Sequence, residues 1–464
     1  MNFKINLDWL KPAPSLPEMT DSALVQKEYK YWRMRIFYSI YVGYVFFYFT
    51  RKSFTFITPF MMQEFGLTIQ DIGFLGTILS VAYGLGKFAS GMLCDKSNPR
   101  YFMAIGLILT GVCNLLFGFS SSLLLFALFW GLNGWFQGWG WPACTKQLTH
   151  WFSRSERGTW WSICTTSHYL GGFVIVYIAG YCAKWFGWRY GMFVPGILCI
   201  FVGLWLLNRL RDTPRSLGLP IIEKFKNEAE FKEKTLESTS TKDILFGEIL
   251  KNKYIWVLVA SYFFAYFVRT ATNDFTNLYL VQVKGFAPLM AGATVSWFEI
   301  GGFLGVLFAG WGSDYFFEGK RIPITILTSF VLIFSVVGLR YIPQHSMMSF
   351  IFASILVAFI GFLVSAPIML IGLASAEFVS KKAASTSNGF AGFFGYLGAA
   401  IAGLPLSMMI KEWGWNSFIL TLVACSACTT IILIPMWSSR GEKMEKDKPE
   451  ETVEFIPDLS SRAV

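Results

Sequence analysis

Long stretches with almost no charge constrain this chain more than any other feature. A helix needs roughly 20 mostly apolar residues to cross a bilayer, and twelve stretches meet that criterion. They lie near residues 36–60, 69–93, 101–120, 123–148, 158–181, 186–208, 254–281, 289–312, 322–341, 348–376, 384–409 and 414–437. Only 15% of the residues are charged, against about 25% in soluble proteins. The sequence therefore predicts an all-α membrane protein and excludes a soluble enzyme, a disordered chain and a nucleic-acid-binding protein.

Polar segments divide these spans six and six. We expect the domain organisation to be a cytoplasmic N-terminal segment (1–35), a six-helix half (36–208), a cytoplasmic linker (209–253), a second six-helix half (254–437) and a cytoplasmic tail (438–464). The first 35 residues lack the apolar core and small-residue cleavage site of a signal peptide. The linker is rich in Lys and Glu.

The distribution of Lys and Arg predicts the orientation of the spans. Of the 39 basic residues, 30 lie in or beside the N-terminal segment, the even-numbered loops, the linker and the tail. Five lie in the odd-numbered loops and four lie inside spans. Because cytoplasmic loops hold the excess of Lys and Arg, both termini are expected in the cytoplasm. The net charge of +10 then reflects topology and not a nucleic-acid partner.

An internal repeat links the two halves. After the second span the sequence reads Gly91-Met-Leu-Cys-Asp95-Lys96-Ser-Asn-Pro-Arg100, and after the eighth it reads Gly310-Trp-Gly-Ser-Asp314, followed by Lys320 and Arg321. The two aspartates are 219 residues apart, and Arg51 and Arg269, which lie inside spans, are 218 apart. Two independent features therefore give the same register, which predicts two pseudo-symmetric halves.

The repeated loop resembles the loop between spans two and three of the major facilitator superfamily. We expect Asp95 and Asp314 to cap or clamp helix ends, and Asp95, Arg100 and Asp314 to belong to the loops that switch conformation. This motif says little about substrate.

The charges inside the spans are the strongest indication of a binding site. Each Arg or Lys at a helix centre costs about 2.5–3.5 kcal/mol. Lys87 can snorkel toward its helix end, but Arg51 and Arg269 each lie roughly 22 Å along the helix from its start. These two arginines must therefore pair with acids, line water or bind an anion.

Few acids are available in the spans to neutralise them. Asp274 follows Arg269 by five residues, a rotation of about 500°, so the two do not share a helix face. We expect Lys52, Asp274 and Glu299 to form an ion-pair network between the halves, leaving both arginines free for a ligand. In the alternative, all the charges pair internally and no anion site exists.

Two arginines related by a pseudo-two-fold axis suit a phosphate dianion, whose oxygens accept forked hydrogen bonds from each side. His168, in span five, could add a third donor. The expected sugar contacts are four aromatic residues: Tyr41, Tyr44, Tyr48 and Trp141.

The cysteines, including Cys425 and Cys428, are expected to be buried packing residues, and no metal or cofactor site is expected.

Three longer motifs resemble one family closely. They are Asn133-Gly-Trp-Phe-Gln-Gly-Trp-Gly-Trp-Pro142-Ala-Cys-Thr-Lys146 with its continuation to Trp161, Tyr48-Phe-Thr-Arg51-Lys52-Ser-Phe54, and Lys381-Lys382-Ala-Ala with Gly389-Phe-Ala-Gly-Phe-Phe-Gly-Tyr-Leu-Gly398. Together they resemble the organophosphate:inorganic phosphate antiporter family, a branch of the major facilitator superfamily. The resemblance covers essentially all twelve spans. Ala143 departs from the pattern, since relatives often have a second proline there.

The resemblance implies roles for the residues named above. Arg51 and Arg269 match the family's paired substrate-phosphate arginines, and Lys52, Lys87 and His168 match positions near its site. Asp274 and Glu299 match the family's acidic positions between the halves.

We therefore expect a secondary transporter, most similar to the family's hexose-phosphate proteins, that exchanges glucose 6-phosphate or a related sugar phosphate for inorganic phosphate. It is expected to be a monomer in a bacterial plasma membrane. The alternative is a membrane sensor that binds a sugar phosphate and signals to a histidine kinase. An enzyme or ATP-driven pump is disfavoured because the sequence lacks a Walker A motif.

Overall fold

The computed structural model describes residues 10–67, 69–226, 243–286, 288–343 and 347–439, and within these ranges it contains helices and no strand. Parts of the predicted N-terminal segment, linker and tail (residues 1–9, 227–242 and 440–464) lie outside the described residues. The all-α fold class predicted from the sequence is confirmed for the part of the chain that is described.

The first half of the bundle consists of α1 (Ser22–Phe65), α2 (Ile69–Asp95), α3 (Pro99–Phe119), α4 (Leu123–Gln137), α5 (Gly140–Trp151), α6 (Arg154–Thr165), α7 (Ser167–Phe186) and α8 (Tyr190–Arg209). A short helix, α9 (Ile222–Phe225), lies in the linker. The second half consists of α10 (Lys253–Gln282), α11 (Pro288–Tyr315), α12 (Ile322–Gly338), α13 (Met347–Glu377), α14 (Ala384–Ile401), α15 (Leu404–Trp413) and α16 (Trp415–Leu433).

Every predicted span falls on one helix or on two consecutive helices. Among the described residues, nine helices are long and apolar enough to cross a membrane. The predicted spans 36–60, 123–148 and 158–181 lie on α1, on α4–α5 and on α6–α7, outside those nine. The count of twelve crossings therefore stays a prediction.

The fourth predicted span is divided into two helices for an identifiable reason. Pro142 has no N–H to donate to the carbonyl of Gly138, four residues earlier, and the helix is interrupted at Gly138 and Trp139. The freed carbonyl accepts a hydrogen bond from Ser90 Oγ of α2 at 2.7 Å. The Gly138 carbonyl oxygen is therefore hydrogen-bonded although the helix is interrupted between α4 and α5.

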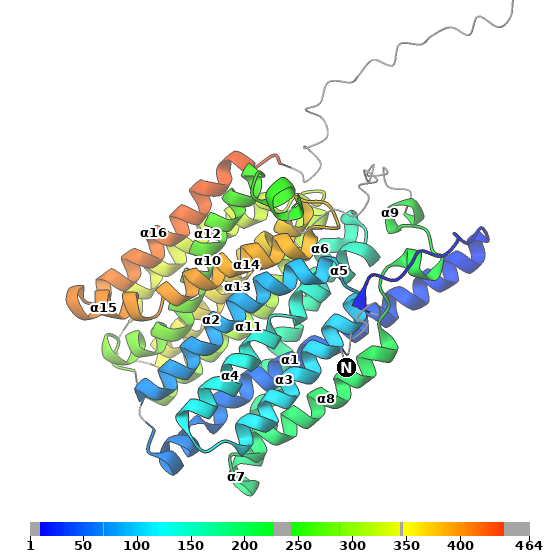
Figure 1. The fold of residues 1–464 in the computed structure, drawn as a ribbon. Coiled ribbons are helices and arrows are strands. Elements are labelled where there is room, and N and C mark those ends of the chain that lie inside the picture. The colour runs from blue at the N-terminus through cyan, green and yellow to red at the C-terminus, as the bar shows by residue number, and fades with distance from the viewer. Residues whose placement is uncertain (1–9, 68, 227–242, 287, 344–346, 440–464) are drawn as a thin grey trace, which may run out of the picture.

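Figure 1 shows the helices side by side in one bundle, with α9 near one end and α15 at the other. We call these the linker end and the far end. At the linker end, α2 ends at Asp95 and α11 ends one residue after Asp314. At the far end, α1 is followed by Gly66, with φ +64°. One buried core extends from the first half into α11 and α13, whereas each half also has a core of its own.

The two halves are joined at the linker end by matched contacts. The carboxylate of Asp95 accepts hydrogen bonds from the backbone N–H groups of Ser385 and Thr386, at 3.1 and 2.7 Å, in the first turn of α14. The repeat-equivalent Asp314 accepts the N–H of Thr159 in α6 at 2.6 Å. Each aspartate therefore binds a helix of the opposite half. We call these two contacts the aspartate clamps.

Candidate functional site

Arg51 and Arg269 come from opposite halves and share several neighbouring residues. Arg51 lies in α1 and Arg269 in α10, and both are partly buried. Both interact electrostatically with Tyr48 and with Lys52. No ion pair joins either guanidinium to an acid within the described residues, although Glu299 and Asp274 both interact electrostatically with Arg269.

Arg51 is oriented by aromatic groups from both halves. Its Nη2 donates to the hydroxyl of Tyr396 in α14 at 3.0 Å. Its Cζ lies 4.6 Å from the ring centroid of Tyr83 in α2 and 5.5 Å from that of Tyr48. Aromatic faces stabilise a desolvated guanidinium without neutralising its charge, so Arg51 keeps its positive charge available to an anion.

More tyrosines surround the arginines than the sequence analysis identified. Tyr169 and Tyr266 are the first-ranked electrostatic neighbours of Arg269. Tyr266 is in ring contact with Tyr396 at 5.5 Å and Tyr262 at 4.8 Å. One sequence signal could have identified part of this set: Tyr266 precedes Arg269 by three residues, and Tyr83 precedes Lys87 by four, so each pair shares a helix face.

His168 lies among three of the aromatic residues predicted as sugar contacts. Its ring is stacked on Tyr48 at 5.0 Å and lies 4.7 Å from Tyr44 and 4.9 Å from Trp141. Its Nε2 is buried and has no hydrogen-bond partner. Arg51, Arg269 and Lys87 are its charged neighbours. A buried polar atom without a partner beside three cations is suited to an anionic ligand.

The fourth predicted contact, Tyr41, lies apart from the arginines. Its hydroxyl is 3.1 Å from Thr166 Oγ1, at the junction of α6 and α7. Tyr41 precedes Tyr48 by seven residues, about 10 Å along α1 toward the linker end. The structure therefore groups Tyr44, Tyr48 and Trp141 around His168 but does not place Tyr41 with them.

Lys87 is buried, with 4% of its surface exposed, at the crossing of α2 and α14. A Cβ added to Gly392 would lie 2.6 Å from Lys87 Nζ, and one added to Gly389 would lie 2.6 Å from the Lys87 carbonyl oxygen. Because Gly389 and Gly392 have no side chains, α14 leaves space for Lys87 between the two halves. Lys87 interacts electrostatically with Arg51 and His168.

The expected ion-pair network of Lys52, Asp274 and Glu299 is not formed in this structure. All three side chains are exposed, and no carboxylate oxygen of either acid lies within the 4.0 Å of Lys52 Nζ that defines an ion pair. Asp274 instead accepts a hydrogen bond from Asn273 Nδ2 at 2.9 Å. Lys52 interacts electrostatically with both acids. The physical reason is that the halves are held together by the aspartate clamps at the linker end, while these groups lie toward the far end.

Arg100, which the sequence analysis assigned to a switching loop, contacts the end of α8. Its guanidinium donates to the carbonyl of Leu207, at the end of α8, and lies 5.0 Å from the ring centroid of Tyr101. No contact joins it to Asp95. In the second copy of the repeat, Arg321 pairs with Asp314 and, through Nε at 3.0 Å, with Glu377 of α13.

The sequence analysis missed an ion-pair cluster at the linker end. Glu377 also lies 3.5 Å from Arg157 of the first half. Glu223, in linker helix α9, lies 3.8 Å from Arg157 and 2.7 Å from Lys381 of the second half. The linker therefore contributes a carboxylate that contacts both halves.

Residues of the fourth-span motif form hydrogen bonds with the turn of α1 that bears Arg51. Gln137 Nε2 donates to Thr50 Oγ1 at 2.8 Å and to the carbonyl oxygen of Phe47 at 2.9 Å. Within α1, the same Phe47 oxygen lies one helical turn before the backbone N–H of Arg51. Asn133 donates to Asn114 at 2.6 Å. These buried amides tie the turn of α1 that bears Arg51 to α3 and α4.

The motif's last residue, Lys146, has a different role. Its Nζ donates to the carbonyl of Ser97 at 2.7 Å, just beyond the end of α2, and lies 3.7 Å from Asp212 in the linker. Burial raises the pKa of the Asp212 carboxyl, and Lys146 partly opposes that rise. Lys146 thus holds the loop beside an aspartate clamp.

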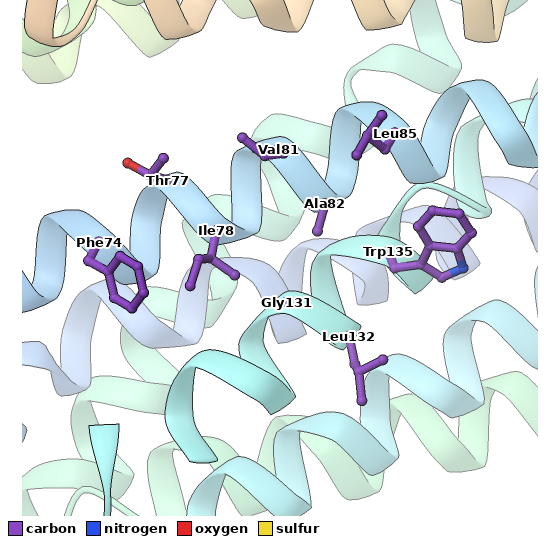
Figure 2. Close-up of a pocket in the computed structure, with 9 residues that line it drawn as sticks. All are labelled: Phe74, Thr77, Ile78, Val81, Ala82, Leu85, Gly131, Leu132 and Trp135. Carbon is purple, nitrogen blue, oxygen red and sulfur yellow. The ribbon is translucent and has the colours of Figure 1, made fainter. Parts of the chain in front are cut away.

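A separate groove lies on the outside of the bundle. Figure 2 shows it between α2 and α4, lined by Phe74, Thr77, Ile78, Val81, Ala82, Leu85, Gly131, Leu132 and Trp135. Its volume is about 500 Å³. None of the predicted site residues lines it. No group of three or more metal-ligating side chains occurs in the described part of the chain.

Residues 40–403 match the model of the Major Facilitator Superfamily. The chain is 48% identical to a "probable hexose phosphate transport protein" of Chlamydia trachomatis serovar D, over 94% of this chain and 99% of the relative. It is 42% identical to the "membrane sensor protein UhpC" of Escherichia coli K12, over 94% and 99%. It is 36% identical to a "glycerol-3-phosphate transporter" of Bacillus subtilis 168, over 95% and 99%.

Solved structures of the same superfamily share the fold. The transporter FucP in its outward conformation superposes with a TM-score of 0.64 at 12% identity, over 86% of this chain and 97% of FucP. The human organic anion transporter MFSD10 superposes with a TM-score of 0.68 at 12% identity, over 86% and 99%. The match to the superfamily model and the curated relatives confirm the sequence-based resemblance to this superfamily, and the solved structures show that the fold is shared.

Proposed function

The chain belongs to the Major Facilitator Superfamily, and on that premise we propose that it exchanges a sugar phosphate, such as glucose 6-phosphate, for inorganic phosphate by alternating access. The observation that carries the proposal is the pair Arg51 and Arg269, one from each half, with no acid paired to either among the described residues. The names of the relatives support the same substrate class.

The family assignment makes the chain a multi-pass membrane protein of a transporter superfamily and not an enzyme. Its substrate is a small molecule that crosses the bilayer. No chemical bond needs to be formed or broken during such transport.

A phosphate dianion is the ligand that this charge arrangement favours. Two planar guanidiniums offer forked N–H donors that match phosphate oxygens. His168 Nε2, buried without a partner, adds a group on the same side as Tyr48. A sugar phosphate and inorganic phosphate share the group that these residues bind, so each can replace the other. We assign the sugar contacts to Tyr44, Tyr48 and Trp141.

Binding a ligand between the halves would couple occupancy to their relative movement. The aspartate clamps close the linker end in this structure, and the exposed Lys52, Asp274 and Glu299 lie toward the far end. We propose that the dianion draws Arg51 and Arg269 together, that the far end then closes, and that the clamps open. Lys52 would pair with Asp274 and Glu299 in that second state.

We further propose that the linker end is cytoplasmic, because 30 of the 39 basic residues lie on that side in the predicted topology. Both termini would then be cytoplasmic, in the plasma membrane of a bacterium. We also propose that residues 209–253 link two halves of six membrane-spanning helices each, and that the protein is a monomer.

A second candidate function is a membrane sensor. The observation in its favour is the 42% identity to the E. coli protein named a membrane sensor. A sensor would bind the same sugar phosphate at the same arginines and pass the conformational change to a histidine kinase without exchange.

Counterflow in liposomes tests the proposal and separates the two candidates. Purified protein is reconstituted in liposomes preloaded with inorganic phosphate, and labelled glucose 6-phosphate is added outside. We expect uptake that depends on internal phosphate and is lost in Arg269→Lys. Arg340→Lys, a matched change at an exposed arginine, is expected to retain uptake.

Each alternative outcome has a definite meaning. Binding of glucose 6-phosphate without uptake would support the sensor instead. Uptake that persists in Arg269→Lys would contradict the paired-arginine site, and the absence of both uptake and binding would contradict the substrate class.

A further inference from the structure

Four arginines gather at the linker end around the last turn of α8. Arg35 of α1, Arg100 of α3 and Arg211 donate to backbone carbonyls of residues 207–210, and Arg209 is part of the turn itself. Arg35 Nη2 lies 3.1 Å from the carbonyl oxygen of Asn208. We call these residues the arginine cluster.

The charge of this cluster is not neutralised within the described chain. No ion pair joins any of the four guanidiniums to a described acid. The carboxyl end of a helix supplies about half a negative charge, against four positive ones. The pKa of Arg211 is lowered, first by desolvation and then by the neighbouring charges of Arg100 and Arg35. An anion placed among these groups would relieve their mutual repulsion.

Arg209 also has an unused hydrogen-bond donor. Its Nε is buried and has no partner, while its Cζ lies 5.4 Å from the ring centroid of Trp205. Buried N–H groups nearly always have an acceptor. The unpartnered donor and the unneutralised charge are independent observations, and both favour an anion at this place.

The cluster lies at one end of α8, which is long and apolar enough to cross a membrane. The Cζ atoms of Arg35 and Arg211 lie 4.9 and 5.0 Å from the ring centroid of Trp32. Trp and Tyr concentrate at the boundary between bilayer and water. Directly along α8 from the cluster, Leu204 and Phe201 are 52% and 66% exposed, so an apolar surface suited to acyl chains adjoins the arginines.

We propose that the arginine cluster binds the phosphate headgroup of an anionic phospholipid in the leaflet at the linker end. Phosphate oxygens accept forked bonds from guanidinium groups, and basic clusters between membrane helices favour anionic headgroups. The acyl chains lie along Leu204 and Phe201. This site is separate from Arg51 and Arg269, and it does not depend on the proposed exchange activity.

Lipid binding by the full chain tests the proposal. The purified protein is placed in phosphatidylcholine nanodiscs with or without phosphatidylglycerol, and bound lipid is measured by native mass spectrometry together with the melting temperature. We expect phosphatidylglycerol to be retained and to raise the melting temperature. In Arg35→Gln/Arg209→Gln, the apparent affinity for phosphatidylglycerol is expected to fall by about tenfold or more.

Two further variants keep the test decisive. Arg209→Gln alone removes a side chain whose Nε makes no hydrogen bond, so it weakens lipid binding without unfolding the chain. Lys253→Gln/Lys320→Gln removes the same charge from the second half and is expected to bind lipid normally. Equal retention of both lipids by the wild-type chain would overturn the proposal. So would equal loss in the control variant, or displacement of the lipid by free inorganic phosphate.

Discussion

Arg51 illustrates how one residue depends on partners from several helices. The hydroxyl of Tyr396, from the other half, accepts one N–H at 3.0 Å, and the Tyr83 ring lies against its guanidinium. On the opposite side, Gln137 binds the backbone of the same helical turn. The charge is therefore positioned from both halves while it stays unpaired.

We expect Arg51→Lys to reduce phosphate exchange by about tenfold to hundredfold. A lysine keeps the charge but loses the fork, and a hydrogen bond to a charged group contributes about 1.5–3 kcal/mol. The measurement is exchange of labelled phosphate in liposomes, with Arg340→Lys as the control. Full activity of Arg51→Lys would contradict a paired-arginine site.

Among the residues of the candidate site, charged side chains are easier to identify from the sequence than neutral ones. Arg51, Arg269 and His168 could be proposed as site residues from the sequence because a polar group in an apolar span is costly and needs a reason. Tyr396 and Tyr169 could not, because a tyrosine in a chain with 47 Phe and 19 Tyr looks the same whether it faces lipid or the arginines. Only the packing of α14 and α7 distinguishes these cases.

The helical elements are joined by backbone acceptors as well as by side chains. Asp95 accepts N–H groups in the first turn of α14, where the helix dipole is positive, and Asp314 accepts the N–H and the hydroxyl of Thr159 in the middle of α6. Glu223 of α9 adds a contact with both halves. The linker end is thus closed by interactions that can be broken without unfolding a helix.

We expect Asp95→Asn to open the linker end more often. The amide keeps one oxygen but loses the charge and the second acceptor that together bind Ser385 and Thr386. Cys94, which is fully buried beside this clamp, should then react several-fold faster with a membrane-permeant maleimide, measured by peptide mass spectrometry. Glu64→Gln, at the far end, serves as the control. Unchanged labelling of Cys94 would show that the clamp does not keep the linker end closed.

The whole molecule consists of two halves that meet closely at the linker end and leave Lys52, Asp274 and Glu299 exposed toward the far end. The predicted ion pairs among these three residues are absent because the structure has one end closed. The repeat register derived from Asp95 and Asp314 matches their equivalent clamps in the two halves.

We expect Asp274→Asn to slow exchange while leaving the affinity for phosphate little changed. The aspartate does not contact either arginine, and its proposed partner, Lys52, is reached only when the far end closes. Calorimetric binding of phosphate and counterflow rates distinguish the two effects, with Glu412→Gln as a control at the far end. A loss of affinity without a change in rate would place Asp274 in the binding site.

The sequence by itself determined the helical class, the repeated loop and the isolated charges, and it predicted the spans, because each of these follows from local hydropathy or from residue spacing. The tertiary structure decided which helix of one half lies against which helix of the other. It therefore decided that Asp95 binds α14, that Arg100 joins α8 instead of a clamp, and that Tyr41 lies away from His168. These pairings join residues up to about 300 positions apart, and no local pattern encodes them.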